Sequence, residues 1–218
     1  MGILDSVFGR SKVLRPDLDR LFALPAAALT LQAGTGFAPT GAGSVCFSGV
    51  EGGSFTRLKE EVRDLLDVDA VGGGARGASG AAAPASFSRD AYGYTWLVAR
   101  RPADDVVTLV NDLHAVNTLL QEAGFGPHLL CSLTAFRAPG HAHELALVYL
   151  YKRGTFYPFA PRTDRREARD NALELEVRAL LAGDLPMEPD LERWFPLWGA
   201  PGLGGGDGRV ESMPRTDT

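Results

Sequence analysis

The chain contains 218 residues and carries a formal net charge of −5, with 22 lysine and arginine residues against 27 aspartate and glutamate residues. This balance argues against a protein that tracks nucleic-acid backbones, because that class needs concentrated positive charge. Hydrophobic residues make up 45% and charged residues 22% of the chain, as in an ordinary globular protein with a buried core. Length and composition therefore predict one domain, or at most two small ones, and leave the activity open.

The first twelve residues, MGILDSVFGRSK, combine a short apolar stripe with the basic residues that follow it. A helix drawn over them would carry on one side Ile3, Leu4, Val7 and Phe8. Such a segment can contact the headgroup layer of a membrane, or it can pack on its own domain, which its length of barely two turns favours. No apolar run approaches the roughly 18 residues that span a bilayer. We therefore expect a cytoplasmic protein in which this segment either contacts the inner membrane face or packs on its own domain.

Two helices and one hairpin are predicted before the middle of the chain. Residues 17–28 carry leucine and phenylalanine at helical spacing, although Pro25 limits how far a helix can extend. Residues 29–33 alternate between apolar and polar, and the apolar pattern returns at residues 44–48 after a stretch rich in glycine and proline. This predicts two short strands joined as a hairpin. Residues 55–66 have one apolar and one charged face, typical of an amphipathic helix.

Low-complexity sequence separates this part from the rest. Residues 72–86 are almost entirely glycine, alanine and serine, and they cannot bury enough side chain to offset the entropy lost on ordering. We interpret them as a flexible insertion within a single α+β domain that spans residues 16–198. Residues 199–218 are polar and rich in glycine, which predicts a disordered tail.

A strand and a long helix are predicted after the insertion. Residues 92–101 are rich in aromatic and β-branched side chains, which is typical of a strand. Asp104 or Asp105 can cap a helix that extends to Ala123. Gly124 stands at the position where a residue in the left-handed conformation commonly ends a helix.

Two further strands and a helix complete the predicted order. The strands, residues 129–136 and 144–152, are separated by turn residues, and a helix over residues 171–182 begins with Asn171 and Glu174 as a capping-box pair. Strands joined by short turns, with helices between the groups, favour an α+β fold with a mainly antiparallel sheet of about five strands. This order resembles the fold of type III secretion chaperones and YbjN-like proteins, a likeness that carries little about function.

Signatures of catalysis or metal binding are weak. The sequence contains no P-loop, no nucleophile elbow and no CxxC pair. His143 and Glu144 begin the zinc-protease pattern HExxH, but Leu147 stands where the second histidine ligand is required. The two cysteines, Cys46 and Cys131, are expected to be reduced thiols of a cytosolic protein. We therefore predict no catalytic residue, no metal and no cofactor.

Aromatic and basic residues gather in two C-terminal segments, which we predict as the partner-binding surface. The first segment doubles back at a turn over Arg153 and Gly154 and supplies Tyr151, Lys152, Arg153, Phe156, Tyr157 and Phe159; the second supplies Trp194, Phe195 and Trp198. A mixture of aromatic and basic residues is typical of protein-binding hot spots. Packing is the open alternative, because a strand, or a strap over the core, can bury the same side chains.

Several longer runs carry a resemblance to a known family. The runs MGILDSVFGRSK, LFALPAAALTLQA, YGYTWLV, DLHAVNTLLQEAGFGPHLLCSL, LVYLYKRGTFYPFAP, RDNALELEVRALL and DLERWFPLWGAPGL resemble the PspA-associated protein PspAB family of actinobacteria. The resemblance covers nearly the whole chain apart from the insertion and the tail. It implies a link to the phage-shock envelope-stress system, with PspA-type proteins or HtpX-type membrane metalloproteases as partners, and it implies no catalytic residue.

These observations together favour a non-enzymatic adaptor or regulator that binds a protein partner near the inner membrane during envelope stress. Two alternatives stay open. One is a hydrolase-type enzyme whose residues converge only in the fold, with His114 or Cys131 involved. The other is a chaperone for a membrane or exported client, which would need a large apolar groove on the sheet.

Overall fold

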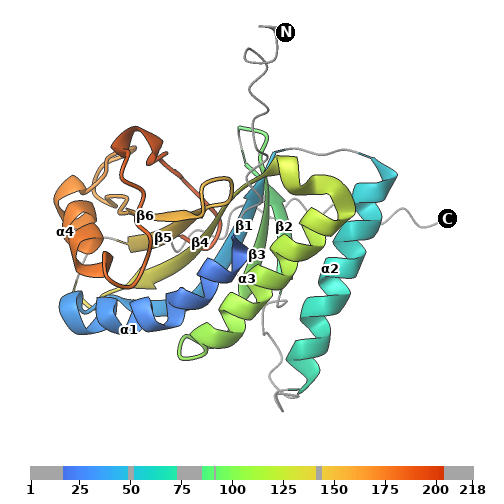
Figure 1. Cartoon of the computed structure of the whole chain (residues 1–218), viewed down its shortest axis with the longest axis horizontal. Coiled ribbons are helices and arrows are strands. Elements are labelled where there is room, and N and C mark those ends of the chain that lie inside the picture. Colours follow the sequence, from blue (N-terminus) through green and yellow to red (C-terminus); the bar gives the residue numbers. More distant parts are fainter. Residues whose placement is uncertain (1–16, 49–51, 73–84, 91, 141–143, 204–218) are drawn as a thin grey trace, which may run out of the picture.

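One six-stranded antiparallel sheet forms the centre of the fold, in the strand order β2-β3-β1-β4-β5-β6 (Figure 1). The computed structural model describes residues 17–48, 52–72, 85–90, 92–140 and 144–203. The strands are β1 (Ala38–Phe47), β2 (Ala85–Arg89), β3 (Thr95–Arg100), β4 (Leu129–Arg137), β5 (Glu144–Leu150) and β6 (Thr155–Phe159). The predicted α+β class with an antiparallel sheet is confirmed, with one strand more than expected.

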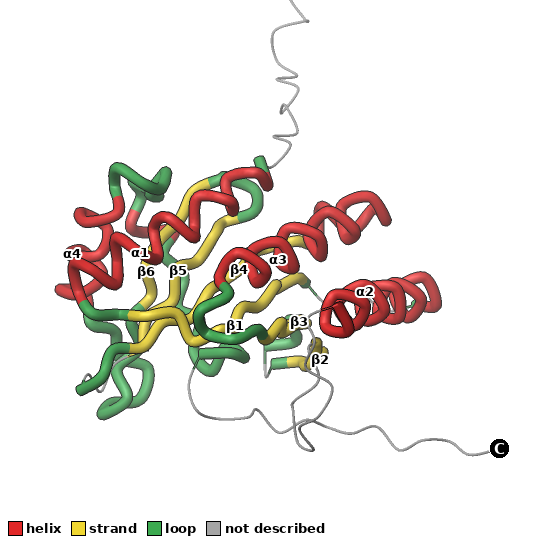
Figure 2. The backbone as a smooth tube through the Cα atoms, turned by 90° about the horizontal axis from the view of Figure 1, so that it is seen from below, coloured by secondary structure: helices red, strands yellow, loops and turns green. Residues whose placement is uncertain are grey.

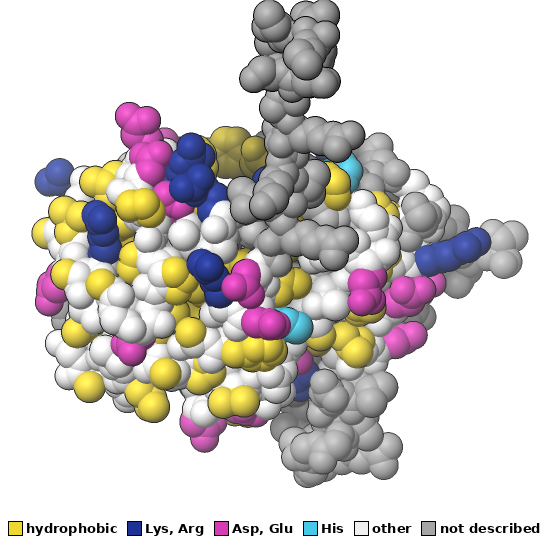
Figure 3. All heavy atoms as spheres, viewed as in Figure 1, with side chains coloured by type: hydrophobic (Ala, Val, Ile, Leu, Met, Phe, Trp, Pro, Cys, Tyr) yellow, Lys and Arg dark blue, Asp and Glu magenta, His cyan; other side chains and the backbone are white. Residues whose placement is uncertain are grey.

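Helices lie on one side of this sheet. The helices are α1 (Leu24–Thr35), α2 (Gly53–Gly72), α3 (Val106–Leu120) and α4 (Asn171–Leu181). Figure 2 shows α1, α2 and α3 on one side of the strands and mainly loop segments on the other, while α4 lies against α1 and β6 at the edge of the sheet. On the helix-covered face, Figure 3 shows hydrophobic side chains interspersed with charged side chains of both signs. Within the described residues, no helix is both long enough and apolar enough to cross a membrane.

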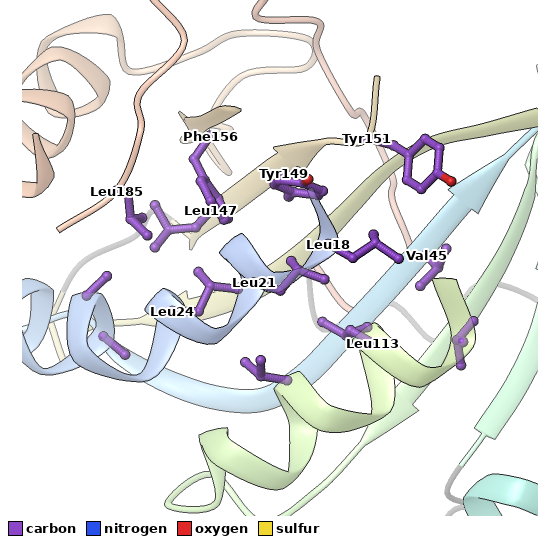
Figure 4. Packing of buried hydrophobic residues seen from close by; sticks show 14 of the residues in the cluster. Leu18, Leu21, Leu24, Val45, Leu113, Leu147, Tyr149, Tyr151, Phe156 and Leu185 are labelled. Atoms are coloured by element: carbon purple, nitrogen blue, oxygen red, sulfur yellow. The ribbon is translucent and has the colours of Figure 1, made fainter. Parts of the chain in front are cut away.

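The larger hydrophobic core lies between the helices and the sheet. Leucines from the short 3-10 helix η1 (Leu18–Ala23) and from α1 and α3 meet side chains of β1, β5 and β6 (Figure 4). The hydroxyl of Tyr149 in β5 donates to the carbonyl of Asp17 at 2.8 Å, which fixes the start of η1 to the sheet. Burial raises the pKa of Tyr149 to about 12, so this hydroxyl stays protonated and remains a donor.

The opposite face of the sheet carries a smaller core, which none of the four described α-helices covers. Residues 194–203, which we call the strap, cross this face, and the strap side chains Trp194, Ala200 and Leu203 are buried against the strands. The sheet contributes to this core Ala42, Cys46, Trp96, Cys131, Leu133, Ala135, Ala146, Val148, Tyr157 and Phe159. The tail predicted from residue 199 onward is therefore wrong for residues 199–203, because the apolar side chains of Ala200 and Leu203 are packed. Residues 204–218 lie outside the described residues.

A buried ion pair connects the sheet to two helices. Arg101 follows β3, and its Nε and Nη2 atoms donate to the Asp112 carboxylate in α3 at 2.6 and 3.0 Å. Arg101 Nη2 also donates to the carbonyl of Leu66 in α2 at 3.4 Å. Only 2% of the Asp112 side chain is exposed, and 8% of the Arg101 side chain. The pair therefore fixes α2 and α3 to one end of β3.

The predicted N-terminal hairpin is wrong. Residues 29–33 lie within α1, and β1 is one strand of ten residues. The alternating pattern of this segment also fits a helix, because the side chains that α1 buries recur at helical spacing, namely Leu24, Ala27, Ala28 and Leu31. Pro25 does not limit the helix, since it stands in the first turn, where no backbone N–H is needed. Gly36, at φ 79°, ends α1 in the left-handed conformation.

Most elements of the C-terminal half are confirmed. Asp105 caps α3 by accepting from the Thr108 backbone N–H, Gly124 is left-handed at φ 85°, and the β5–β6 hairpin turns at Arg153 and Gly154. The capping box predicted for α4 is wrong. Asp170 caps this helix, while the Glu174 carboxylate accepts instead from the backbone N–H of Ala160 and from Arg169.

The predicted insertion differs at both ends. Helix α2 extends to Gly72, beyond the predicted residue 66, and residues 85–89 form β2, which pairs with β3 along its whole length. The side chain of Phe87 packs against the helix-side core, which gives this otherwise small-residue segment an apolar anchor. Residues 73–84 lie outside the described residues. So do residues 1–16, including the predicted membrane-contact residues Ile3, Leu4, Val7 and Phe8.

Candidate functional site

A pocket of about 680 Å³ opens on the strap-covered face of the sheet. Its floor consists of buried side chains from four strands. Cys46 of β1 pairs with Trp96 of β3 and with Cys131 of β4, and Tyr157 of β6 completes the floor. The strap closes part of it through residues 195–198. We call this space the strap pocket, and its other lining residues are Asp90, Tyr92, Tyr94, Leu130, Leu150, Lys152, Arg153, Glu167 and Arg193.

Hydrogen bonds from buried groups hold the start of the strap in place. The Trp194 carbonyl accepts from Arg169, and the Phe195 carbonyl accepts from the hydroxyl of Tyr157 at 2.9 Å. Burial raises the pKa of Tyr157 well above its ordinary value, so its hydroxyl stays protonated and keeps donating. The indole N–H of Trp194 donates to the Glu188 carbonyl at 3.2 Å. With its backbone fixed at two consecutive residues, the strap presents Phe195 to solvent while Trp194 points into the core.

Glu188 anchors the chain that leads into the strap. Its side chain is fully buried, and its carboxylate accepts from Arg153 Nε at 2.7 Å, from the Thr155 hydroxyl at 2.6 Å and from the Asp190 backbone N–H at 3.2 Å. Desolvation acts to raise the pKa of Glu188, but the hydrogen bonds from Arg153, Thr155 and Asp190 outweigh it and hold that pKa below its usual value. The carboxylate is therefore ionised at neutral pH and ties the β5–β6 turn to the strap.

The turn between β2 and β3 supplies two exposed aromatic rings to the pocket. Asp90 organises this turn: its carboxylate accepts from the backbone N–H groups of Tyr92 and Tyr94, each at 2.9 Å, and from the indole N–H of Trp96 at 2.9 Å. Tyr92 is 69% exposed and Tyr94 is 41% exposed. An aspartate that bonds backbone groups two and four residues on is a common way to fix a tight turn. The tyrosines are thus held at the pocket on a defined backbone.

Three cationic side chains line the pocket. Arg153 pairs with Glu188, and Arg193 pairs with Asp190 at 3.0 Å. Lys152 is exposed, and no described residue bonds to it. The lining contains two acidic residues, Asp90 and Glu167. Asp90 already accepts three hydrogen bonds within its own turn. Lys152 is therefore the cation of this pocket that is available to a ligand.

The two cysteines meet at the floor of the pocket. Cys46 and Cys131 are direct partners across β1 and β4, and both are buried free thiols. The hydrogen bond to Cys131 and then burial raise the pKa of the Cys46 thiol far above its ordinary value. No histidine belongs to the residues that line this pocket. A buried thiol pair with no histidine among the residues that line the pocket does not have the arrangement that nucleophilic catalysis by Cys131 needs.

His114 lies away from the strap pocket. It stands in α3 on the helix-covered side, where its ring packs against Phe22 at a tilt of 32° with centroids 4.6 Å apart. Its Nε2 lies 3.3 Å from Asp19 Oδ1. Asp19 is exposed, so this pair lies at the surface rather than in a closed polar cavity. Among the described residues no three histidine, cysteine, aspartate or glutamate side chains gather into a metal site.

The nine predicted partner-binding residues divide into two groups. Five are buried: Tyr151 and Phe156 lie in the helix-side core, and Tyr157, Phe159 and Trp194 lie in the strap-side core. Of these five, only Tyr157 also reaches the pocket floor, so packing accounts for the other four. The remaining four, Lys152, Arg153, Phe195 and Trp198, all line the strap pocket. The fold thus brings the exposed residues of two predicted segments to one site.

Several lining residues were missed in the sequence. Asp90, Tyr92 and Tyr94 reach the pocket because β2 pairs with β3, and β2 was not predicted. The signal that could have found them is the run RDAYGYTW, in which a turn former and a glycine separate two tyrosines next to a strand. Arg193 was also missed, although it directly precedes the predicted run WFPLW.

A comparison with models of known protein families shows to which family the chain belongs. The model of the PspAB family, described as PspA associated protein B, matches residues 1–202. The chain belongs to this family. The matched range runs from the N-terminal segment through nearly all of the strap. No curated protein and no solved structure matches the chain. The likeness to the type III secretion chaperone fold therefore stays a prediction, and PspA is the protein with which the family is associated by name.

Proposed function

We propose that this PspAB-family chain is a non-enzymatic adaptor that binds a PspA-type protein through the strap pocket. Membership of a family described as PspA associated supports the choice of partner. The observation that carries the proposal is the pocket itself, because it is hollow, lined by apolar side chains and surrounded by exposed aromatic rings. Large aromatic side chains and cations around an apolar hollow are typical of protein-binding hot spots.

Exposure of these rings supports a partner of macromolecular size. Tyr92 is 69% exposed, Tyr94 is 41% exposed and Phe195 is 58% exposed. Burying such aromatic side chains away from water would lower the free energy of the system. Their backbones are fixed by Asp90 and by the strap anchors, so little conformational entropy is lost when a partner covers them. A pre-ordered apolar surface of this kind favours binding over a purely structural role.

Reversing the charge of Lys152 is the sharpest test of this site. We expect Lys152→Glu to weaken the binding of a purified PspA-type protein by about tenfold, since it places an acid where the available cation stood. Isothermal titration calorimetry against the full-length chain measures the change. The matched control is Arg57→Glu, the same charge reversal on an exposed position of α2. Equal affinity of both variants and the unmodified chain would contradict the assignment of the pocket as the binding site.

Lys152 is preferred over its neighbour for a structural reason. Arg153 pairs with the fully buried Glu188, so a change at Arg153 leaves an unpaired buried carboxylate and loosens the strap. A loss of binding in an Arg153 variant would therefore mix a local unfolding effect with a contact effect. Unchanged urea midpoints for Lys152→Glu and Arg57→Glu would show that both variants keep the fold.

We further propose that the chain works at the inner face of the membrane during envelope stress, held there by residues 1–12. The apolar stripe and the basic residues of this segment support peripheral contact. Deleting residues 1–12 is expected to reduce co-sedimentation with vesicles that contain anionic lipid, measured against neutral vesicles as the control. Equal sedimentation of the full chain and the shortened chain would overturn this part of the proposal.

A chaperone for a membrane or exported client is the second candidate. The observation that favours it is the position of the strap pocket on the open face of the sheet, with an apolar floor. The two candidates differ in the state of the partner, because an adaptor binds folded PspA-type protein whereas a chaperone prefers an unfolded client. An HtpX-type protein is the other candidate partner, and the same calorimetric experiment applies to its soluble part.

A further inference from the structure

The interior of the strap pocket selects for apolar side chains. Its floor is formed by Cys46, Trp96, Cys131 and Tyr157, all less than 10% exposed, and Leu130, Leu150 and Leu197 add aliphatic surface. The indole N–H of Trp96 and the hydroxyl of Tyr157 already donate to Asp90 and to the Phe195 carbonyl. These polar atoms of the floor are thus engaged within the protein. A volume of about 680 Å³ lies within the usual range of ligand pockets, roughly 300 to 1,000 Å³.

The charges around the pocket favour a negatively charged group beside that apolar part. Arg153, Arg193 and Lys152 face two acids, and one of these, Asp90, is occupied by the turn that it caps. The chain as a whole carries a net charge of −5. Because Arg153 and Arg193 already pair with Glu188 and Asp190, the positive charge that the pocket offers to a ligand is the exposed ammonium of Lys152, which can pair with a carboxylate without breaking a bond already made.

The exposed aromatic rings indicate that the ligand extends beyond the pocket. A small acid that fits into about 680 Å³ would leave outside it much of Tyr92, 69% exposed, and of Phe195, 58% exposed. A polypeptide can insert a side chain into the hollow while its backbone and neighbouring residues cover these rings. Tyrosine is well suited to such a contact, because its large ring has little conformational freedom to lose.

We propose that the strap pocket recognises a peptide segment with an acidic residue next to one or two large apolar side chains. The apolar side chains insert over Cys46, Trp96 and Cys131, the carboxylate pairs with Lys152, and the flanking backbone lies against Tyr92 and Phe195. This inference rests on the proposed function, since it assigns to the PspA-type partner an acidic segment with an apolar anchor.

Three short synthetic peptides without tryptophan test the assignment. The first contains a Phe-Leu pair flanked by aspartates, the second replaces the aspartates with lysines, and the third replaces the Phe-Leu pair with serines. Because Trp96 and Trp198 line the pocket, intrinsic tryptophan fluorescence of the full chain reports occupancy directly. We expect the first peptide to bind with a Kd of about 10 to 100 µM, and the other two to bind about tenfold more weakly. The affinity for the first peptide should also fall as salt is raised.

A charge swap separates a contact from an effect on folding. Lys152→Glu is expected to lose affinity for the acidic peptide and to gain affinity for the lysine peptide, whereas Arg57→Glu should behave like the unmodified chain. Loss of affinity for both peptides, or equal affinity for all three peptides, would overturn the role of Lys152. Binding of dodecanoate without binding of the acidic peptide would overturn the proposal in favour of a lipid. Self-association that hides both tryptophans would overturn it in favour of a second copy of the chain.

Competition keeps this inference distinct from the proposed function. If a PspA-type protein binds the full chain and the acidic peptide displaces it, both the adaptor function and the peptide assignment are supported. If the PspA-type protein binds but the peptide neither binds nor competes, the adaptor function stands and the peptide assignment is wrong. If the peptide binds and the PspA-type protein does not, the pocket assignment stands and the choice of partner is wrong.

Discussion

Replacing Asp112 with alanine is expected to lower the free energy of unfolding by about 3 to 5 kcal/mol, the cost of removing one partner from a buried ion pair. The change leaves the Arg101 guanidinium 8% exposed without its bidentate carboxylate, between α2, α3 and the end of β3. Urea denaturation followed by circular dichroism measures the difference. Since Asp112 does not line the strap pocket, any effect on peptide binding should follow from unfolding alone.

Two further variants serve as controls for the predicted effect of Asp112→Ala. Asp104→Ala, an exposed acid just before α3, should change stability by less than about 0.5 kcal/mol. The double variant Arg101→Met with Asp112→Leu removes both charges and should recover much of the loss, because an uncompensated buried charge is worse than an apolar pair. A stability of Asp112→Ala equal to that of Asp104→Ala would show that the ion pair contributes little.

Replacing Glu188 with glutamine is expected to destabilise the protein by about 2 kcal/mol at neutral pH, because a buried carboxylate that accepts from Arg153, Thr155 and Asp190 becomes a neutral amide. The effect depends on pH in a defined direction. The pKa of Glu188 is lower in the folded protein than its ordinary value of 4.5, so the ionised carboxylate stabilises the fold fully above pH 4.5. That contribution is lost as the pH falls through the lower, folded-state pKa.

The comparison of two pH profiles tests this prediction. The difference in unfolding free energy between the unmodified chain and Glu188→Gln should be constant above about pH 5.5 and should shrink below pH 4.5. Glu192→Gln, an exposed acid in the next turn of chain, serves as the control and should follow the unmodified chain. Profiles that run parallel down to pH 3 would contradict the assigned role of Glu188. Loosening of the strap should also shift the emission of Trp194 and Trp198 before global unfolding.

The local sequence pattern was sufficient to predict those helices and strands whose buried residues recur at one unambiguous spacing. Helix α3, the strands β3, β4 and β5, and the β5–β6 turn are all read from spacing, caps and turn residues. The errors lie where two patterns fit the same residues or where a distant contact decides. Residues 29–33 alternate like a strand yet bury a helical stripe. Glu174 does not take its expected capping role, because its carboxylate accepts from Arg169 and from the Ala160 backbone N–H instead. The strand β2 depends on its pairing with β3 and on Phe87, which a composition of small residues conceals.

The site could be predicted only in part for the same reason. The residue types of the two C-terminal segments indicated binding, and Lys152, Phe195 and Trp198 do line one pocket. Which aromatic residues face solvent depends on which face of the sheet each strand position takes and on what covers that face. The strap covers Phe159 and fixes Trp194 in the core, and neither fact follows from the spacing of the aromatic residues. The contribution of Asp90 and Tyr92 depends on the β2–β3 hairpin, whose first strand begins within the predicted insertion.

The order of the chain has a consequence for biosynthesis. All six strands are complete at Phe159, but the residues that cover the second face of the sheet are the last ones of the described fold, 194–203. A nascent chain therefore exposes apolar side chains such as Trp96, Leu133 and Val148 until the strap has left the ribosome, which takes several seconds at roughly 5 to 20 residues per second. During that interval the uncovered apolar face can contact other unfinished chains, which makes it the part of this fold most exposed to aggregation during synthesis.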